Sequence, residues 1–339
     1  MATSAGQITI AVFGDKGCGK STLCGRLCRR YGDFDDEALK KAKEAIKKYE
    51  RKENCEYAFL CDTHDNDRKN GTSGTHLLGF QLTINKSRQL KQEYTIIDSG
   101  SSLKNRHRLV RGAFGQSQIG ILLLEINNND MQAFKDSISS KSDIYQYLVI
   151  CHAFGVQKLL IALNKADSAQ HEVDANLYEE CKQSIQATLN SIGYNADNVP
   201  VIPISGYYGD NVFKASTRQS LSWWTGFEIA SKSQHGAKTH QITTLLKGIK
   251  YLSLKSKPLA TKNLNAPMIL TVKSRLEVRG VGTVFLSRVD QGQLSKNQTV
   301  LCCKARHEML VKRYTVKSIQ SHGKDREVAR MGDIIGFTV

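Results

Sequence analysis

The chain has 339 residues and a formal net charge of +16 at pH 7, with 40% hydrophobic and 24% charged residues. This length suits about two domains, each with its own core, and the composition is that of a globular protein, which excludes wholesale disorder. The longest strongly apolar run, Ile119 to Leu124, is too short to cross a bilayer, and the first residues contain no signal-peptide pattern, so we expect neither membrane insertion nor secretion.

The nine cysteines are an odd number and show no C-x-x-C spacing. This pattern is typical of reduced thiols, so we expect a cytoplasmic protein without a structural metal site. The high positive charge, with a sequence pI near 9.4, favours an acidic polyanion as partner: the ribosome, RNA or a cytoskeletal filament. A solvated basic surface that aids solubility is the alternative. The basic clusters are residues 40–52, 104–111 and 304–317.

The first predicted strand, Ile8 to Phe13, leads into the sequence GDKGCGKST, which matches the phosphate-binding loop G-x-x-x-x-G-K-S. Glycines allow the backbone N–H groups to turn toward a phosphate, and the following helix adds its positive N-terminal end. Lys20 is expected to reach the β- and γ-phosphates, and the Ser21 hydroxyl suits Mg²⁺. The predicted nucleotide-binding residues here are Gly14, Asp15, Lys16, Gly17, Cys18, Gly19, Lys20, Ser21 and Thr22.

Beyond this loop, apolar residues at 3–4 spacing predict a helix over residues 33–53, and the polar stretch 61–75 predicts a long loop. Strands are predicted over residues 77–84 and 93–97. The second of these ends at Asp98, which is therefore positioned to hold the Mg²⁺ hydration shell, as a Walker-B Asp does. A helix N-cap or Asx-turn is the alternative role for this carboxylate.

A buried strand over residues 119–126 is followed by a polar connection and a helix over residues 144–154. The next strand, 158–163, ends in Asn164-Lys165-Ala166-Asp167. In an N-K-x-D sequence the Asp carboxylate accepts the N1–H and 2-amino protons of guanine, which adenine does not offer. Binding adenine would leave that carboxylate unpaired, and this cost discriminates against adenine. Asn164, Lys165 and Asp167 are therefore predicted to recognise a guanine base.

After a helix predicted over residues 175–192, the strand 199–204 leads to Ser205, Gly206 and Tyr207, where the backbone is expected to meet the guanine O6. The pair Trp223-Trp224 has two interpretations, packing inside the domain or stacking on bases, and packing is favoured. A last helix is predicted over residues 240–254.

The strand and helix pattern divides the chain into two predicted domains. Residues 1–255 alternate between strands and helices, which predicts an α/β domain with a mostly parallel sheet. Residues 256–339 show short strands separated by glycine-rich turns, which predicts a small β-barrel. The chain stops directly after a strand-like segment, so we expect the barrel to be truncated here.

Taken together, the motifs resemble the elongation factor 1-alpha family of EF-Tu-like translational GTPases. The resemblance rests on GDKGCGKST, IIDSGS, LLIALNKAD and VIPISGYYGDN, and on RGVGTVFLSRVDQGQLSKNQTV with ARMGDIIGF near the end of the chain. It implies a P-loop GTPase domain followed by a β-barrel, with GTP or GDP and Mg²⁺ as ligands. The family's third domain, a barrel that helps to hold aminoacyl-tRNA, is not in this sequence.

Two segments depart from the family. Its switch I sequence R-G-I-T-I-D is replaced by residues 70–75, where Ser73 is the candidate substitute for the Mg²⁺-binding Thr. Its switch II sequence D-A-P-G-H is replaced by DSGSS from Asp98 to Ser102. This change removes the Gly that senses the γ-phosphate and the His that positions the attacking water. His107 is the nearest alternative for that role.

The predicted metal ligands are therefore Ser21, Asp98 and Ser73, and no catalytic residue is assigned. The first hypothesis is a guanine-nucleotide-binding protein with weak or lost GTP hydrolysis that docks onto a larger assembly, because the pocket residues are kept while the switch residues are changed. The alternatives are an active translational GTPase, in elongation, termination or ribosome rescue, and a cytoskeleton-associated module. Whether the protein is an enzyme is left open by the sequence.

Overall fold

The structure, a computed structural model, describes most of the chain as two compact units. One unit contains Thr9–Phe80 and Thr95–Ser256, and the other contains Met1–Ile8, Gln81–Tyr94 and Lys257–Val339. The domain boundary between residues 255 and 256 stays a prediction, because it lies next to an undescribed segment. The described residues are 5–32, 34–50, 55–62, 68, 76–85, 90–99, 113–126, 130–167, 173–233, 236–255, 266–278, 280–303, 311–321 and 324–339.

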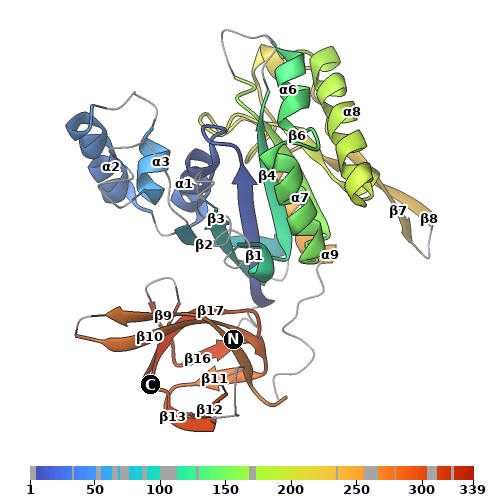
Figure 1. The fold of residues 1–339 in the computed structure, drawn as a ribbon. Helices are drawn as coiled ribbons and strands as arrows, with labels where there is room; N and C mark the ends of the chain where they lie inside the picture. Colours follow the sequence, from blue (N-terminus) through green and yellow to red (C-terminus); the bar gives the residue numbers. More distant parts are fainter. Residues whose placement is uncertain are drawn as a thin grey trace. The chain divides into compact units, whose positions relative to one another are not determined.

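Most of a six-stranded sheet with the order β2-β3-β1-β4-β5-β6 lies in the first unit (Figure 1). Strand β1 pairs in parallel with β4, β4 with β5, and β5 with β6, so their carboxyl ends meet at one edge. All residues of β4 except the last are buried, as expected for a strand that is covered on both faces. The mostly parallel sheet is thus confirmed. The strands are β1 (Ala5–Gly14), β2 (His76–Asn85), β3 (Leu90–Asp98), β4 (Ile119–Glu125), β5 (Lys158–Asn164) and β6 (Val201–Pro203).

Helices surround this sheet, and polar side chains cap several of them. Asp35 accepts a hydrogen bond from the Ala38 N–H at 2.8 Å, and Asp174 accepts one from the Leu177 N–H at 2.8 Å. Gly193 ends α8 with a φ of 107°, as predicted. The helices are α1 (Lys20–Tyr31), α2 (Asp36–Lys48), α3 (Glu56–Cys61), α6 (Met131–Ser137), α7 (Asp143–Ala153), α8 (Ala175–Ile192) and α9 (Leu245–Lys255).

Two predicted segments differ from the structure. The connection over residues 127–143 contains α6, a helix of seven residues that was not predicted because it is shorter than the window over which periodicity indicates a helix. The helix predicted over residues 240–254 starts only at Leu245, as α9. Residues before it form β8 (Gly236–Ile242), which pairs antiparallel with β7 (Phe227–Ser233).

The two tryptophans pack inside the first unit, which confirms the favoured interpretation. The Trp223 Nε1–H donates to the carbonyl oxygen of Val173 at 2.9 Å, and the Trp224 Nε1–H donates to that of Thr243 at 2.9 Å. Both rings also contact the Tyr178 ring, with centroids 5.4 and 5.2 Å apart. These half-buried indoles therefore satisfy their N–H groups within the fold, as packed tryptophans usually do.

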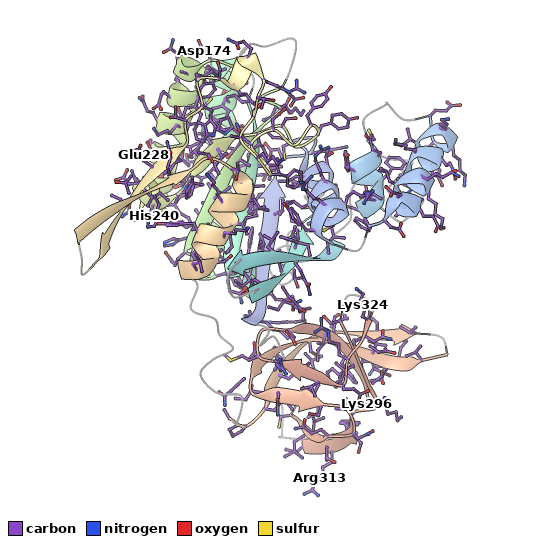
Figure 2. All side chains as sticks on the ribbon, turned by 180° about the vertical axis from the view of Figure 1, so that it is seen from behind. Asp174, Glu228, His240, Lys296, Arg313 and Lys324 are labelled. Carbon is purple, nitrogen blue, oxygen red and sulfur yellow. The ribbon has the colours of Figure 1, made fainter. Side chains whose placement is uncertain are left out.

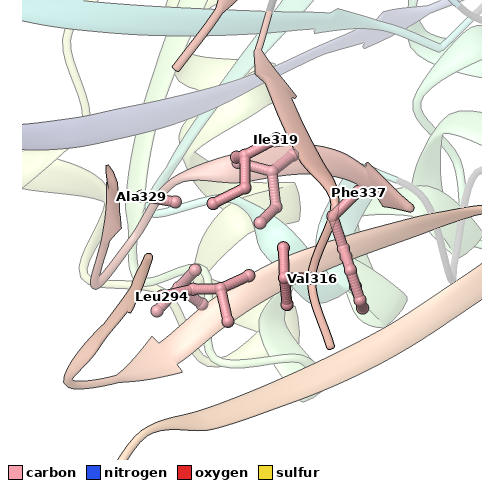
Figure 3. Close-up of a cluster of buried hydrophobic side chains, with 7 residues drawn as sticks. Leu294, Val316, Ile319, Ala329 and Phe337 are labelled. Atoms are coloured by element: carbon pink, nitrogen blue, oxygen red, sulfur yellow. The ribbon is translucent and has the colours of Figure 1, made fainter. Parts of the chain in front are cut away.

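The second unit is built mainly from antiparallel strands, which agrees with the predicted small β-barrel domain. Its five-stranded sheet has the order β15-β14-β17-β10-β9, and two further strand pairs are β11-β16 and β12-β13. Leu294, Val316, Ile319, Ala329 and Phe337 belong to its buried core (Figure 3). The strands are β9 (Ile269–Val278), β10 (Gly282–Gln291), β11 (Gln293–Ser295), β12 (Thr299–Cys303), β13 (Val311–Thr315), β14 (Ser318–Ser321), β15 (Lys324–Asp325), β16 (Val328–Arg330) and β17 (Ile334–Thr338).

Basic side chains line exposed surfaces of both units. In the second unit Lys296, Arg313 and Lys324 are exposed, and Arg313 stands away from its strand in Figure 2. All nine cysteines have free thiols, and Cys302 and Cys303 are the exposed ones. In the described parts of the chain, no helix is long and apolar enough to span a bilayer. The exposed lysines of α2 are Lys40, Lys41, Lys43, Lys47 and Lys48.

Candidate functional site

The loop between β1 and α1 has a backbone that depends on its glycines. Gly14, Gly17 and Gly19 have φ values of 145°, 85° and 98°, which side-chain-bearing residues rarely adopt. A Cβ on Gly14 would lie 2.2 Å from the Leu123 carbonyl oxygen, and one on Gly19 would lie 2.3 Å from Asn164 Nδ2. The loop therefore passes directly against β4 and the end of β5. Gly19 is the N-cap of α1, so the helix begins where the loop ends.

Lys20 is the first residue of α1, and its ammonium group lies inside this loop. The side chain is buried, with 4% of its surface exposed. Its Nζ donates to the carbonyl oxygens of Gly14 at 2.9 Å and of Asp15 at 2.7 Å. These contacts hold a positive charge where the loop and the helix N-terminus converge, which makes the loop an anion-binding concavity.

Ser21 and Asp98 meet although they are 77 residues apart in the sequence. The Ser21 hydroxyl donates to Asp98 Oδ2 at 2.7 Å, and the carboxylate is completely buried. The Ser99 N–H that follows donates to the Val12 carbonyl oxygen at 3.1 Å, which holds the end of β3 beside β1. A hydroxyl and a carboxylate are the oxygen ligands that Mg²⁺ prefers, so this pair fits a magnesium site.

Asn164 joins the loop after β1 to the loop after β6. Its side chain is buried, Nδ2 donates to the Cys18 carbonyl oxygen at 2.7 Å, and Oδ1 accepts from the Gly206 N–H at 2.8 Å. The next residue, Lys165, has a φ of 66° and its Nζ pairs with Glu125 at 2.6 Å. The structure thus brings the predicted phosphate and base residues together through one side chain.

The loop of residues 205–209, called here the base-facing loop, is closed by Ser205. Its hydroxyl accepts from the Tyr208 N–H at 3.0 Å, and its carbonyl oxygen accepts from the Gly209 N–H at 2.8 Å. A cavity of about 290 Å³ lies between this loop, the N-K-x-D segment and the glycine loop. Its lining residues are Gly17, Gly19, Thr22, Asn164, Lys165, Asp167, Tyr207 and Tyr208.

Burial shifts the titration of two residues in the glycine loop. It raises the pKa of the Asp15 carboxyl above its usual range, although the Lys20 ammonium opposes the shift. Burial likewise raises the pKa of the Cys18 thiol. A thiol with a raised pKa stays protonated at neutral pH, so Cys18 is a packing residue rather than a nucleophile.

Three residues that the sequence analysis did not single out also belong to the site. Arg26 on α1 donates hydrogen bonds to the carbonyl oxygens of Tyr207 and Tyr208. Glu125 pairs with Lys165, and the Tyr208 side chain lines the cavity. Glu125 is the charged residue that ends a buried strand, and this was a usable signal, the same one that identified Asp98. No sequence motif marks Arg26.

Partial burial and the Glu56 carboxylate raise the pKa of Tyr207 to about 12, and the Tyr207 hydroxyl donates to Glu56 Oε1 at 2.9 Å. This phenol is therefore neutral at physiological pH. Several predicted positions lie outside the described residues: the candidate metal ligand Ser73 with residues 70–75, the replaced switch segment from 100 to 102, and His107.

Comparisons with known proteins agree with this geometry. The family model described as the elongation factor Tu GTP binding domain matches residues 6–264. Elongation factor 1-alpha from Metallosphaera sedula is 28% identical over 333 residues, covering 98% of this chain and 68% of that protein, and the Aspergillus oryzae protein is 28% identical over 98% of this chain and 66% of its own length. The S. cerevisiae Ski7 GTPase-like domain has the same fold, with a TM-score of 0.76 over 99% of this chain and 70% of that chain at 17% identity.

Proposed function

This chain belongs to the elongation factor Tu GTP-binding domain family, and from that premise we propose that it binds GTP or GDP in the cavity beside Asn164. We propose further that it hydrolyses GTP slowly or not at all. The bound nucleotide then stabilises the fold, while the basic surface docks onto a larger assembly in the cytoplasm.

The observation that carries the proposal is the double hydrogen bond of Asn164, to Cys18 on the phosphate side and to Gly206 on the base side. A nucleotide spans both sides, so a single side chain that joins them prepares the whole pocket. On the phosphate side, the Lys20 ammonium donates to the carbonyl oxygens of Gly14 and Asp15, and it would also reach the β- and γ-phosphate oxygens of a bound nucleotide. On the base side, the half-buried Asp167 lines the cavity and supplies the carboxylate that pairs with guanine.

Mg²⁺ fits the paired oxygens of Ser21 and Asp98, with Ser73 as the third candidate ligand. When bound, this ion neutralises charge on the β- and γ-phosphate oxygens. Ser21 supplies its hydroxyl oxygen, and the buried Asp98 carboxylate supplies the charge that holds the metal's hydration shell. Two structures of the S. cerevisiae Ski7 GTPase-like domain, one bound to GDP and inorganic phosphate and one bound to GTP, support guanine nucleotides as the ligand class.

Weak hydrolysis follows from the residues after Asp98. The sequence Ser99-Gly100-Ser101-Ser102 offers no imidazole to position the attacking water, unlike the family pattern D-A-P-G-H. Phosphoryl transfer depends on positioning and charge stabilisation, so this loss is expected to lower the rate by orders of magnitude. A nucleotide at a thousand times its Kd still adds roughly 4 kcal/mol of stability, so the pocket is useful without turnover.

An active translational GTPase is the second candidate. Its supporting observation is the 28% identity to elongation factor 1-alpha over 98% of this chain. For docking, the exposed lysines of α2 favour the phosphate backbone of RNA or a ribosome, and a cytoskeletal filament is the other acidic surface that suits them. Co-sedimentation with ribosomes and with filaments, measured in separate assays, distinguishes these partners. Binding driven by the lysines should weaken as the salt concentration rises.

Titration calorimetry and single-turnover kinetics test the proposal. The protein is titrated with GDP, GTP, ADP and ATP in Mg²⁺ buffer, and is then incubated with stoichiometric GTP with and without ribosomes. We expect binding of both guanine nucleotides, none of the adenine nucleotides, and no conversion of GTP over hours. Equal binding of ADP would contradict the base assignment, and rapid conversion would favour the second candidate.

A further inference from the structure

Helix α3 lies against both α1 and the base-facing loop. Its approach to α1 is so close that a Cβ on Gly25 would lie 1.9 Å from the Tyr57 carbonyl oxygen. Such contact between backbones leaves no room for α3 to slide along α1. The beginning of α3, at Glu56 and Tyr57, is therefore placed next to the residues that line the base side of the cavity.

Arg26 connects these elements through its planar guanidinium group. The fork donates to two successive carbonyl oxygens, those of Tyr207 and Tyr208, and its Cζ lies 4.7 Å from the centre of the Tyr57 ring. Gly209 permits this approach: its φ is 88°, and a Cβ there would lie 2.8 Å from Arg26 Nε. One side chain thus contacts α3 and the base-facing loop at the same time.

A second connection runs directly from the base-facing loop to α3. The Tyr207 hydroxyl donates to Glu56 Oε1 at 2.9 Å, and the rings of Tyr207 and Tyr57 meet edge to face with centroids 6.1 Å apart. Helix α3 in turn shares a buried cluster with α2, to which Ile46 and Phe59 belong. The base-facing loop is therefore connected through α3 to α2, the helix that carries the exposed lysines.

We infer that Arg26 is a positioning residue that joins the base-facing loop, α3 and α2 into one rigid body, so that occupancy of the guanine-base side of the cavity orders α3 and α2. None of the contacts described above, from Arg26, Tyr207 or Glu56, depends on a γ-phosphate. GDP and GTP therefore act alike on these helices. The inference rests on the proposed function and adds to it the regulation of the basic α2 surface by nucleotide occupancy.

The test compares the wild-type chain with Arg26→Ala and Arg26→Lys, and uses Arg30→Ala as the matched control. Arg30 lies on the same helix, and its guanidinium contacts the Phe213 ring at 5.0 Å. The rate of release of a fluorescent GDP analogue is measured by stopped flow. We expect release to be at least about tenfold faster for Arg26→Ala, because hydrogen bonds from a charged group are lost. Lysine keeps the charge without the fork, so it should restore only a small part, and Arg30→Ala should stay within about twofold of wild type.

Hydrogen exchange of residues 56–61 and 36–48 supplies the second readout. In the wild type, saturating GDP and GTP should slow this exchange equally, and in Arg26→Ala neither should. If Arg26→Ala does not fold, Tyr207→Phe carries the test, since it removes only the Glu56 contact and should speed exchange in α3 with nucleotide bound.

Three results would overturn the inference: unchanged GDP release in Arg26→Ala, protection of α3 by GTP but not GDP, or unchanged exchange in Tyr207→Phe. Failure of the wild type to bind either nucleotide would instead contradict the proposed function itself, so the two failures are distinguishable.

Discussion

Replacing Asn164 by alanine is expected to destabilise the first unit even without nucleotide. The substitution leaves two buried backbone groups without their partner, the Cys18 carbonyl and the Gly206 N–H, which now bond to Asn164 at 2.7 and 2.8 Å. An unsatisfied buried polar group costs about 1–3 kcal/mol, so the loss is about 2–6 kcal/mol. For a unit of this size, each kcal/mol lowers Tm by about 2–4 °C, which gives a decrease of at least about 4 °C.

The assay is thermal unfolding in nucleotide-free buffer, followed by tryptophan fluorescence. The chain has two tryptophans, Trp223 and Trp224, and both lie in the first unit, so the signal reports on that unit. The control is Asn190→Ala, because exposed Asn190 accepts a single hydrogen bond from the Ala196 N–H at 3.2 Å. A Tm for Asn164→Ala within 1 °C of the control would refute the reasoning that this side chain holds the two loops together.

Three further outcomes follow from the site and the core. Lys20→Ala should weaken GDP binding at least about a hundredfold by calorimetry, because it removes the buried ammonium, whereas exposed Lys16→Ala should change it by less than about fivefold. Asp167→Asn should lose affinity for GDP and gain affinity for xanthosine diphosphate, whose C2 carbonyl accepts from the new amide; unchanged GDP affinity would contradict the role of the carboxylate. Burial raises the pKa of Cys151 and of Cys181 to about 12. Between the ordinary thiol pKa and pH 12 the unfolded chain loses these protons while the folded protein keeps them. The free energy of unfolding is therefore highest below the ordinary pKa and falls as the pH rises toward 12. Unfolding by urea should therefore become easier by up to about 1.4 kcal/mol per pH unit for each thiol above pH 9, and a flat profile would contradict their burial.

Much of the site could be predicted from the sequence because its residues follow strands directly. Gly14, Asp98 and Asn164 each come at the end of an apolar run, and parallel strands carry such ends to one edge of a sheet. The structure places the hydroxyl of Ser21 on Asp98, as the motif implied, although 77 residues separate them. These predictions depended on local sequence and on a topology with few alternatives.

What could not be predicted depended on contacts across the fold. Arg26 looks like any other polar residue of an amphipathic helix, and its role arises only because Gly209 lies opposite it. Helix α6 could not be predicted because it has only seven residues, and the start of α9 was misplaced because β8 pairs with β7 rather than continuing into the helix. Periodicity needs a longer segment than α6 to indicate a helix, and it says little about hairpins.

The most direct test of the central claim is the identity of the nucleotide that the protein carries and keeps. The protein is purified natively, denatured, and its released nucleotide is identified by chromatography, and the experiment is repeated after incubation with GTP. The account predicts a guanine nucleotide close to one per chain, with GTP still present as GTP after hours. Release of no nucleotide from a protein that also fails to take up GTP would contradict the account, and so would conversion of the bound GTP to GDP.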